Sequence, residues 1–477
     1  MATEFMDIPR SNPRYRPGRE RDFRDVEIRL GPEGARRQAS RCMGCGVPFC
    51  HGYGCPLSNA IPDAMAAVAE GRMRDAYEIF RATSPFPEFT SRVCPALCES
   101  ACCAGISFSP VTVKQVEYEV AEAAFENGWA VPAGRAPRTG RRVAVIGSGP
   151  AGLAAAGALN RSGHEVVVFE KAASAGGLLR YGIPDFKLEK RVVDRRIGLL
   201  CAEGVMFEYG VEVGRDVSAA YLMRKFDAVC LCTGCPVPRD LAVPGRNLDG
   251  IFFALEFLAG QNRAISGELD GVPVSAKGKK VLVIGGGDTG SDCVGTAIRQ
   301  GAKSVVQIEI MPEPPEGRHP STPWPMWEYK KRTSSSHLEG GTRMWGVVAK
   351  SFGGARGRVK SLKAGLADWE FSPEGRPSKF SERPGGDFEI DADLVLISMG
   401  FTGAERGPMA GELGLDFSER GTFASLRPSK AFPGVFAAGD CVGGPSLVVR
   451  AAASGLAAAA SVSEYLKSVP QHNNLKK

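Results

Sequence analysis

The sequence lacks any apolar run of the roughly 18 residues that a helix needs to cross a bilayer. Its first residues, Met1-Ala2-Thr3-Glu4, also lack the basic and then apolar stretch that is typical of a secretory signal. These two absences predict a cytoplasmic protein that does not associate with a membrane.

Other features of unusual chains are missing as well. Lys and Arg form no block interleaved with aromatic residues, and the net charge of +6 is small for 477 residues, so we expect no nucleic-acid partner. Low-complexity tracts are absent despite 59 Gly and 33 Pro, and 43% of the residues are hydrophobic. This composition excludes a disordered or fibrous chain, and the length allows about three globular domains.

Cysteine is the residue type whose distribution is informative. A disulfide framework needs an oxidising compartment, so thiolate ligation of metal is the better interpretation here. The spacing differs from the paired Cys-x2-Cys knuckles of structural zinc and resembles runs that hold cubane iron–sulfur clusters. Eight of the 14 cysteines, enough for two clusters, lie close together: Cys42, Cys45, Cys50, Cys55, Cys94, Cys98, Cys102 and Cys103.

The second cysteine run has a regular spacing, because Cys94, Cys98 and Cys102 follow one another at intervals of four. This spacing predicts one helix with three thiols on the same face, each one turn further along. A cluster edge is shorter than two helical turns. We therefore expect these thiols to be divided between two clusters, with the end residue serving one and the others the second.

A dinucleotide-binding motif follows the cysteine region. Residues 141–146 predict a short buried strand, and Gly147-Ser148-Gly149-Pro150-Ala151-Gly152 leads from it into an Ala-rich helix. The next strand ends at Glu170. Together these elements form the dinucleotide fingerprint: glycines allow close approach of the backbone, the helix N-terminus faces the pyrophosphate, and the acid accepts from a ribose hydroxyl.

The same unit occurs a second time. A strand at residues 279–284 leads into Gly285-Gly286-Gly287-Asp288-Thr289-Gly290, and a later strand ends at Glu309. Near the C-terminus a further strand ends at Gly439-Asp440, where we expect the aspartate to face a flavin. This layout predicts an α/β two-dinucleotide-binding, Rossmann-like flavoprotein with an N-terminal α-helical [4Fe-4S] domain.

The domain organisation follows from these motifs and from helical periodicity at residues 61–80 and 112–125. The first 41 residues read as an irregular arm, either a solvated tail or, as the alternative, a docking segment. Residues 312–345, rich in Pro and Trp, read as an excursion that could cover the nicotinamide. The expected division is a helical iron–sulfur domain at 1–135, an FAD-binding domain at 136–275, an NAD(P)H-binding domain at 276–395 and a return to the FAD-binding domain at 396–477.

The motifs resemble those of the small subunit of glutamate synthase over about residues 40–465. A wider superfamily, which includes dihydropyrimidine dehydrogenase and electron-bifurcating transhydrogenases, shares the cysteine module and the flavin core. Besides both glycine-rich turns, the resemblance is carried by Cys42-Met-Gly-Cys45, Pro48-Phe49-Cys50, Gly54-Cys55-Pro56-Leu57, Arg92-Val93-Cys94-Pro95, Gly176-Gly177-Leu178-Leu179-Arg180-Tyr181-Gly182-Ile183-Pro184, Pro238-Arg239-Asp240-Leu241 and Ala438-Gly439-Asp440.

The resemblance implies two [4Fe-4S] clusters. An oxygen ligand to such a cluster is unusual, so Cys103 is the alternative to Glu117 for the fourth position of the second cluster. The implied ligands are Cys42, Cys45, Cys50 and Cys102 for one cluster, and Cys55, Cys94, Cys98 and Glu117 for the other.

The resemblance also implies that the first fingerprint holds FAD and the second holds the nicotinamide cofactor. Glu309 favours NADH, because a carboxylate accepts from a ribose 2′-hydroxyl and repels a 2′-phosphate. NADPH is the alternative, if Arg318 or Lys303 folds back to the ribose. The implied FAD-binding residues are Gly147, Gly149, Pro150, Ala151, Gly152, Glu170, Gly177, Leu178, Thr233, Gly234, Gly439 and Asp440, and those for the nicotinamide cofactor are Gly285, Gly287, Asp288, Thr289, Gly290 and Glu309.

The function implied by the resemblance is electron input to glutamate synthase. NADH or NADPH is oxidised through FAD, and the electrons pass through the clusters to a large FMN-containing amidotransferase subunit, which makes glutamate from glutamine and 2-oxoglutarate. The chemistry of such an NAD(P)H-dependent oxidoreductase belongs to its cofactors, so we expect no catalytic side chain.

Three alternatives remain at this stage. The first is a related module that serves ferredoxin or another dehydrogenase. The second is a disulfide reductase that uses Cys232-Thr-Gly-Cys235, although these thiols are expected to be packed in a turn and not to act as nucleophiles. The third is a non-enzymatic protein that keeps its cofactor sites for structure alone.

Overall fold

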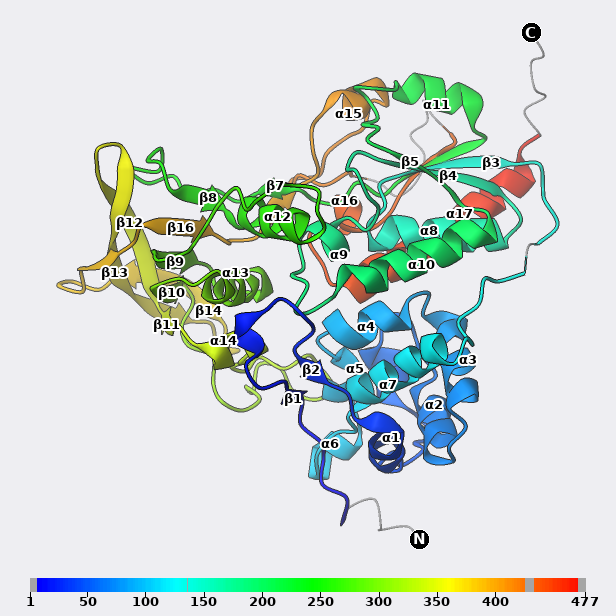
Figure 1. The fold of residues 1–477 in the computed structure, drawn as a ribbon, viewed down its shortest axis with the longest axis horizontal. Helices are drawn as coiled ribbons and strands as arrows, with labels where there is room; N and C mark the ends of the chain where they lie inside the picture. Colours follow the sequence, from blue (N-terminus) through cyan, green and yellow to red (C-terminus); the bar gives the residue numbers. More distant parts are fainter. Residues whose placement is uncertain (1–6, 135, 425–432, 471–477) are drawn as a thin grey trace.

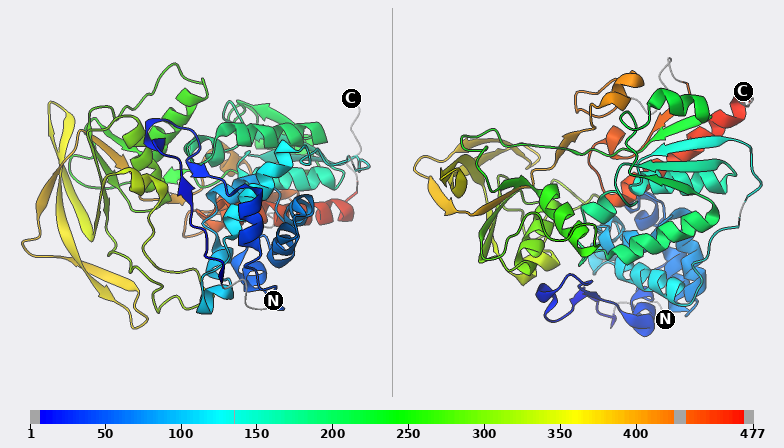
Figure 2. Two further views of the ribbon diagram at one scale, coloured as in Figure 1. Left: turned by 60° about the horizontal axis from the view of Figure 1, so that its bottom comes forward. Right: turned by 45° about the horizontal axis from the view of Figure 1, so that its top comes forward.

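The structure is a computed structural model that describes residues 7–134, 136–424 and 433–470. In this part of the chain, no helix combines the length and the apolar character that crossing a membrane requires. Figure 1 shows a bundle of short helices beside two α/β units, and Figure 2 shows the same arrangement from two further directions. We call these the first and second nucleotide units, because each contains one of the two fingerprints.

The N-terminal helices form the first of these parts, which we call the helical unit. Residues such as Ala76, Tyr77 and Phe80 recur at helical spacing and are buried on one face of their helix. The helices are α1 (Gly31–Ala39), α2 (Ile61–Ala69), α3 (Met73–Thr83), α4 (Pro87–Val93), α5 (Leu97–Ser100), α6 (Ala104–Ser107) and α7 (Val113–Glu126), with a 3₁₀ turn η2 (Arg19–Arg21), a π turn η3 (Cys50–Gly54) and the antiparallel pair β1 (Arg14–Tyr15) and β2 (Glu27–Ile28).

The helix predicted across the second cysteine run does not form. Helix α4 ends at Val93, Pro95 follows, and Ala96 has a φ of 65°, in the left-handed region that interrupts a helix. Cys98 alone lies on α5, whereas Cys94 and Cys102 lie on the irregular backbone on either side. The expectation of one helical face bearing three thiols is therefore wrong.

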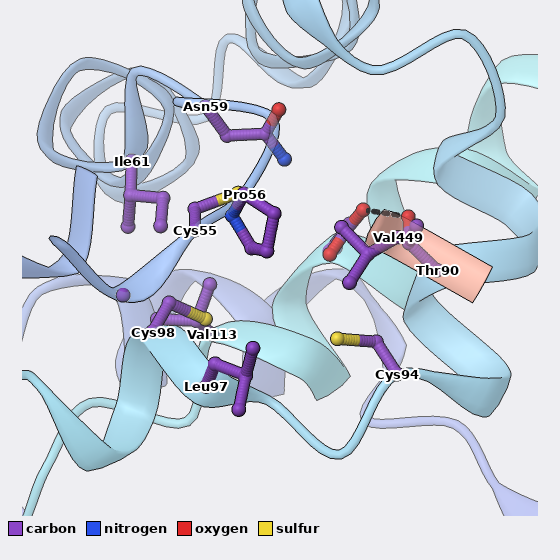
Figure 3. Close-up of a pocket in the computed structure, with 12 residues that line it drawn as sticks. Cys55, Pro56, Asn59, Ile61, Thr90, Cys94, Leu97, Cys98, Val113 and Val449 are labelled. Atoms are coloured by element: carbon purple, nitrogen blue, oxygen red, sulfur yellow. Dashed lines mark hydrogen bonds between the residues drawn. The ribbon is translucent and has the colours of Figure 1, made fainter. Parts of the chain in front are cut away.

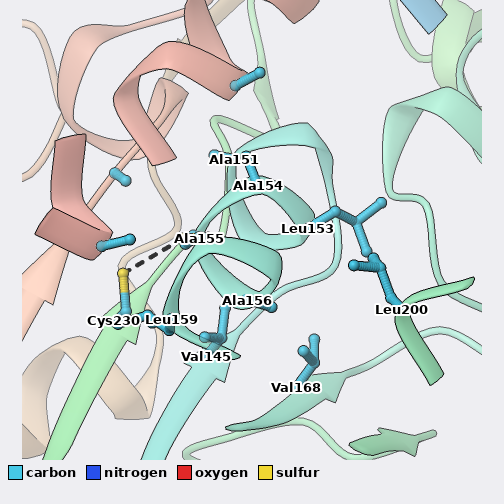
Figure 4. Packing of buried hydrophobic residues seen from close by; sticks show 14 of the residues in the cluster. Val145, Ala151, Leu153, Ala154, Ala155, Ala156, Leu159, Val168, Leu200 and Cys230 are labelled. Carbon is cyan, nitrogen blue, oxygen red and sulfur yellow. Dashed lines mark hydrogen bonds between the residues drawn. The ribbon is translucent and has the colours of Figure 1, made fainter. Parts of the chain in front are cut away.

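The first nucleotide unit is a parallel five-stranded sheet. Four of its strands are largely apolar and buried, as the near-continuous runs of Val and Ile in the sequence require, whereas the edge strand at residues 206–209 is largely exposed. Helix α8 packs on this sheet through small side chains such as Ala154 and Ala155 (Figure 4). The strand order is β18 (Val435–Ala437), β6 (Ala228–Leu231), β3 (Arg142–Ile146), β4 (Glu165–Glu170) and β5 (Met206–Tyr209), with helices α8 (Pro150–Arg161), α9 (Leu178–Tyr181), α10 (Lys190–Glu203), α11 (Ala219–Lys225), α15 (Pro408–Glu412), α16 (Asp440–Gly443) and α17 (Val448–Ser468).

The second nucleotide unit repeats this plan. Its sheet is again parallel and has the order β11 (Thr342–Trp345), β10 (Ser304–Glu309), β9 (Lys280–Ile284), β16 (Leu394–Ile397) and β8 (Ile251–Phe253), with helices α12 (Ala254–Ile265), α13 (Asp288–Arg299) and α14 (Ser335–Glu339). An antiparallel ribbon extends from it, formed by β12 (Val347–Ala355), β13 (Arg358–Phe371), β14 (Pro377–Glu382) and β15 (Phe388–Asp391).

The boundaries of this unit differ from those expected. Strand β8 and helix α12 pair and pack within the second unit, although the sequence assigned residues 136–275 to the first. The reason is that β8 is too short and too close to its turn to carry a recognisable pattern. The two connections between the units, β7 (Val237–Pro238) and β17 (Phe401–Gly403), pair with each other.

The arm at residues 7–30 reaches from the helical unit to both nucleotide units, as the left view of Figure 2 shows. The amide of Val26 donates to the carbonyl of Phe186 in the first unit at 3.1 Å. Arg299 of the second unit donates to the carbonyl of Asp22 at 2.8 Å, and Arg19 pairs with Glu339 at 3.0 Å. The expectation of a solvated tail is wrong, because these contacts fix the arm on three sides.

A long loop at residues 312–334 runs in the opposite direction, from the second nucleotide unit to the helical unit. The indole ring of Trp324 packs on Phe49, with ring centroids 4.6 Å apart. Arg318 donates to the carbonyl of Ser100 at 3.1 Å and pairs with Glu328. The loop therefore contacts the cysteine region, and its expected role over a nicotinamide stays a prediction.

Candidate redox sites

The first glycine-rich turn lies between β3 and α8, at the carboxyl edge of the first sheet. Gly147 has a φ of 98°, and a Cβ at Gly152 would come within 1.9 Å of the Gly147 carbonyl oxygen, so the turn can close only with glycine at both positions. Space beside Gly149 is open. The carboxylate of Glu170, at the end of β4, accepts from the amide of Ser148 at 3.0 Å and faces the turn.

The other residues predicted to bind FAD border the same place. A Cβ at Gly177 would lie 2.8 Å from the Cα of Gly149, and one at Gly439 would lie 2.7 Å from the side chain of Ala151. The Oγ1 atom of Thr233, just after β6, is buried beside the thiol of Cys441. Burial raises the pKa of Asp440 although Ser446 donates to its carboxylate at 2.6 Å. Open space beside Gly149, bordered by glycines that allow close approach of the backbone, fits a dinucleotide.

The second glycine-rich turn repeats this geometry between β9 and α13. Gly285 has a φ of 121°, and the space beside Gly287 is open. The carboxylate of Glu309 accepts from the amide of Gly286 at 2.6 Å and from that of Met311 at 3.0 Å, so it occupies the place that Glu170 has in the first unit. Asp288, Thr289 and Gly290 lie in the first turn of α13.

Lys303 and Arg318, the two cations considered as partners for a 2′-phosphate, both lie away from Glu309. Lys303 precedes β10, at the opposite end of the strand from Glu309. Arg318 donates to the carbonyls of Thr322 and Met326 within the loop at residues 312–334, besides that of Ser100. Among Glu309, Lys303 and Arg318, only Glu309 therefore faces the second glycine-rich turn.

One cavity in the helical unit is lined by the thiols of Cys42, Cys45, Cys50, Cys102 and Cys103. We call it the distal cavity, because none of its lining residues comes from the first nucleotide unit. Burial, with smaller contributions from the neighbouring Cys102 and Cys42, raises the pKa of Cys50 to about 12. Cys103 lines this distal cavity and does not line the proximal cavity, which is described next. The lining residues are Cys42, Met43, Cys45, Cys50, Ile61, Pro62, Met65, Cys102, Cys103, Ala104, Val111 and Val113.

A proximal cavity collects Cys55, Cys94 and Cys98 together with Glu117 (Figure 3). The carboxylate of Glu117 is fixed by the hydroxyl of Thr90, which donates to it at 2.6 Å. Burial raises the pKa of Glu117 to about 7, and it raises that of Cys94 to about 11. The rest of the wall consists of Gly54, Pro56, Asn59, Ile61, Thr90, Leu97, Val113 and Val449.

The two cavities suit polynuclear clusters. Among the described residues, no three His, Cys, Asp or Glu side chains are arranged to hold a single metal ion. Thiols spread around a cavity are instead what a cubane needs, because its iron and sulfide atoms hold the ligands apart. Ile61 and Val113 line both cavities, so the cavities are neighbours.

The thiols of the Cys-x2-Cys pair do not form an exposed redox centre. Both Cys232 and Cys235 are buried. Burial raises the pKa of Cys235 to about 11, and the hydrogen bond that the Cys232 thiol shares with Cys230, whose sulfur is 3.8 Å away, together with burial raises that of Cys232. Thiols held protonated in this way are poor nucleophiles.

Sequence reasoning missed several residues that hold the sites in place. Thr90 orients Glu117, and Lys187 of the first unit forms an ion pair of 2.5 Å with Asp292 on α13 of the second unit. Gln307 is a buried polar residue within an apolar strand, which is the one signal that the sequence offered.

Comparisons with known proteins agree with this arrangement. Residues 19–129 match the family described as dihydropyrimidine dehydrogenase domain II, 4Fe-4S cluster, and residues 141–322 match pyridine nucleotide-disulphide oxidoreductase. The solved structure of Mycobacterium tuberculosis FprA in complex with NADPH shares the fold, with a TM-score of 0.54 and 19% identity over 70% of this chain and 85% of that one.

Two curated relatives are much more similar in sequence. The glutamate synthase [NADPH] small chain of Mycobacterium tuberculosis is 51% identical over 94% of this chain and 92% of its own length. The glutamate synthase [NADH] of Schizosaccharomyces pombe is 45% identical over 93% of this chain, which corresponds to 22% of that longer protein. The chain is thus an oxidoreductase with a 4Fe-4S domain and an FAD/NAD(P)-binding fold, and it belongs to the glutamate synthase small-subunit family.

Proposed function

We propose that this chain is the electron-input subunit of a glutamate synthase. The observation that carries the proposal is the presence in one chain of two glycine-rich turns, each at the end of a parallel strand, and of two neighbouring thiol-lined cavities. FAD, when bound, would accept a hydride from the nicotinamide and release electrons singly to iron–sulfur clusters. The residues of this chain supply the binding sites, their order and the exclusion of water.

The lining residues support an order for the two clusters. Val449 lines the proximal cavity and lies at the start of α17, shortly after the Asp440 turn of the flavin site. The proximal cluster, held by Cys55, Cys94, Cys98 and Glu117, would therefore stand beside the flavin, and the distal cluster, held by Cys42, Cys45, Cys50 and Cys102, would stand on the far side of Ile61 and Val113. Cys103 would be a neighbour of the distal cluster and not a ligand of the proximal one.

The electron donor in this proposal is NADH. Glu309 faces the second turn, where it would accept from the ribose 2′-hydroxyl and repel a 2′-phosphate. Lys303 lies at the opposite end of β10 from Glu309, and the guanidinium of Arg318 is bonded to carbonyls of its own loop. Neither residue is therefore placed to offset that repulsion. The names of the relatives include both NADPH and NADH, so the geometry of Glu309 is what favours NADH.

The partner in this proposal is the large subunit of glutamate synthase, in keeping with the family of the chain. It would receive electrons from the distal cluster, and four exposed apolar side chains lie close in the sequence to the cysteines of that cavity. We call this surface the exit patch: Met43, Val47, Tyr53 and Ile106 are 41%, 75%, 55% and 59% exposed. A cytoplasmic location stays a prediction.

One experiment tests the proposal. The tagged protein is purified anaerobically from its host, its partners are identified by mass, and the eluate is assayed for NADH-driven formation of glutamate from glutamine and 2-oxoglutarate. A large amidotransferase and glutamate as product are expected. Recovery of ferredoxin or another dehydrogenase, without glutamate formation, would favour the related electron-transfer module instead.

A further inference from the structure

We infer that Gln307 and His337 are positioning residues for the nicotinamide dinucleotide, because they form a hydrogen-bond chain that holds the second glycine-rich turn in shape. The inference rests on the proposed function, in which this turn binds NADH. It also gives a role to the segment Thr333-Ser-Ser-Ser-His337.

The chain of hydrogen bonds has a single direction. The amide of Ser334 donates to Nδ1 of His337 at 3.3 Å, Nε2 of His337 donates to Oε1 of Gln307 at 2.8 Å, and Nε2 of Gln307 donates to the carbonyl of Gly285 at 2.8 Å. Each group acts in the role that a neutral imidazole and an amide allow. The last acceptor, Gly285, is the first residue of the glycine-rich turn.

A second contact from the same segment reaches the other flank of the turn. The Oγ atoms of Ser334 and Ser291 are 2.6 Å apart, and Ser291 follows Gly290 in the first turn of α13. A Cβ at Gly290 would lie 2.6 Å from Nε2 of Gln307, so the amide packs directly against the turn. The segment therefore supports the turn at both of its ends.

The first nucleotide unit provides an internal comparison. Its acidic strand end, Glu170, corresponds to Glu309, so Val168 on β4 corresponds to Gln307 on β10. Val168 is completely buried and makes no polar contact with its turn, whereas Gln307 is 3% exposed and bonds at both ends of its amide. Burying an amide is costly unless it is satisfied, so this polar chain is a device specific to the second unit.

The test compares four single variants of the holoenzyme and one double variant, which combines His337→Leu with Gln307→Val. His337→Leu fills the volume of the ring without hydrogen bonds, His337→Gln retains a donor near the position of Nε2, and Gln307→Val copies the first unit. His164→Leu, at a buried histidine of the first nucleotide unit, is the matched control. Isothermal titration with NAD⁺ on the oxidised protein gives the dissociation constant, and NADH–ferricyanide assays give KM and kcat.

We expect His337→Leu and Gln307→Val each to raise the NAD⁺ dissociation constant and the NADH KM about fivefold to tenfold, because one neutral hydrogen bond that supports the turn is lost. The kcat of each variant should stay within about twofold of the wild-type value. The double variant should be no weaker than either single variant, because both break the same chain. His337→Gln should recover most of the affinity, and FAD and iron contents should stay at the wild-type level.

Unchanged NAD⁺ affinity in His337→Leu would overturn the inference and leave the proposed function intact. Equal losses in His337→Leu, His337→Gln and His164→Leu, with lower kcat, would also overturn it, because they would indicate a general loss of folding. If the wild-type holoenzyme binds neither NAD⁺ nor NADP⁺, the proposed function of the second unit and the inference both fail.

Discussion

The Arg196 guanidinium donates two hydrogen bonds to the Glu88 carboxylate, at 2.5 and 3.0 Å, and the Glu88 side chain is completely buried. Glu88 lies in the first turn of α4, the helix that ends just before Cys94, and Arg196 lies on α10 of the first nucleotide unit. The pair therefore fixes helix α4, which borders the proximal cavity, against the first nucleotide unit.

Removal of one partner of this pair should be costly. In Glu88→Gln the buried guanidinium loses its counter-ion, and the loss should destabilise the folded protein by about 3 kcal/mol. The measurement is thermal unfolding of the holoprotein, with iron content recorded alongside. Glu78→Gln, which breaks the exposed pair with Arg81, should change the midpoint little; an equal effect of the two variants would contradict the assigned importance of the buried pair.

The fourth ligand of the proximal cluster can be identified by analysis of iron. Glu117→Ala should lose about four irons per chain, one cubane cluster, because the remaining three thiols cannot complete the site. Cys103→Ser should retain all of its iron, since Cys103 lines the distal cavity beside four other thiols. Loss of iron from Cys103→Ser, with retention in Glu117→Ala, would reverse the assignment.

The negative charge of Glu309, beside the second glycine-rich turn, should determine whether NADH or NADPH is used. We expect the wild-type protein to prefer NADH over NADPH by at least about tenfold in kcat/KM, and Glu309→Ser to lose most of that preference, because the repulsion of a 2′-phosphate disappears. Steady-state reduction of ferricyanide with each cofactor measures the ratio. A wild-type preference for NADPH of tenfold or more would refute the role of Glu309.

The pH dependence of stability should reveal His337. Burial, with smaller contributions from Arg343 and Lys187, lowers the pKa of His337 from 6.5 to about 4. As the pH falls from 6.5 toward 4, His337 binds a proton in the unfolded chain but not in the folded chain, so the free energy of unfolding falls. After allowance for the partial exposure of the ring, the loss should be about 1 kcal/mol at pH 5.

Thermal unfolding at pH 7.5 and pH 5.0 checks this expectation. His337→Gln should lose less stability than the wild-type protein over that range, since glutamine does not titrate. If the two proteins lost the same amount, the destabilisation would have to come from other groups.

The exit patch can be tested without disturbing a thiol. Val47→Asp places a charge on a side chain that is 75% exposed, so folding should be unaffected. If the large subunit docks here, NADH-driven glutamate formation should fall at least about tenfold, while NADH–ferricyanide activity stays at the wild-type level. Val131→Asp, at an exposed valine of the linker, serves as the control, and equal glutamate formation in both variants would contradict the docking site.

Short motifs made much of this molecule predictable. Each fingerprint needs a strand, a close turn and a helix in sequence, so Gly147 and Gly285 could be placed at the carboxyl edge of their sheets from local order alone. The division of the cysteines was also expected in outline. The helix drawn through Cys94 and Cys98 was wrong, because spacing says nothing of the break at Pro95 and Ala96.

Other features depend on contacts between residues far apart in the chain. Nothing near Gln307 in the sequence indicates that His337 is its partner, and nothing near Asp22 indicates Arg299. The paths of the arm and of the loop at residues 312–334 are set by tertiary packing, so neither was predictable from composition. Strand β8 was missed for the same reason, because its three residues gain their structure from the neighbouring β16.

The arm and the loop bearing Trp324 cross between the helical and second nucleotide units in opposite directions. Each unit thereby completes its packing with a segment that belongs to the other, and neither segment can be detached without exposing what it covers. The limits of the motifs along the sequence are therefore not limits of cooperativity. A cut in either crossing would loosen both units together, so evolution or an engineer could exchange these parts only as a set.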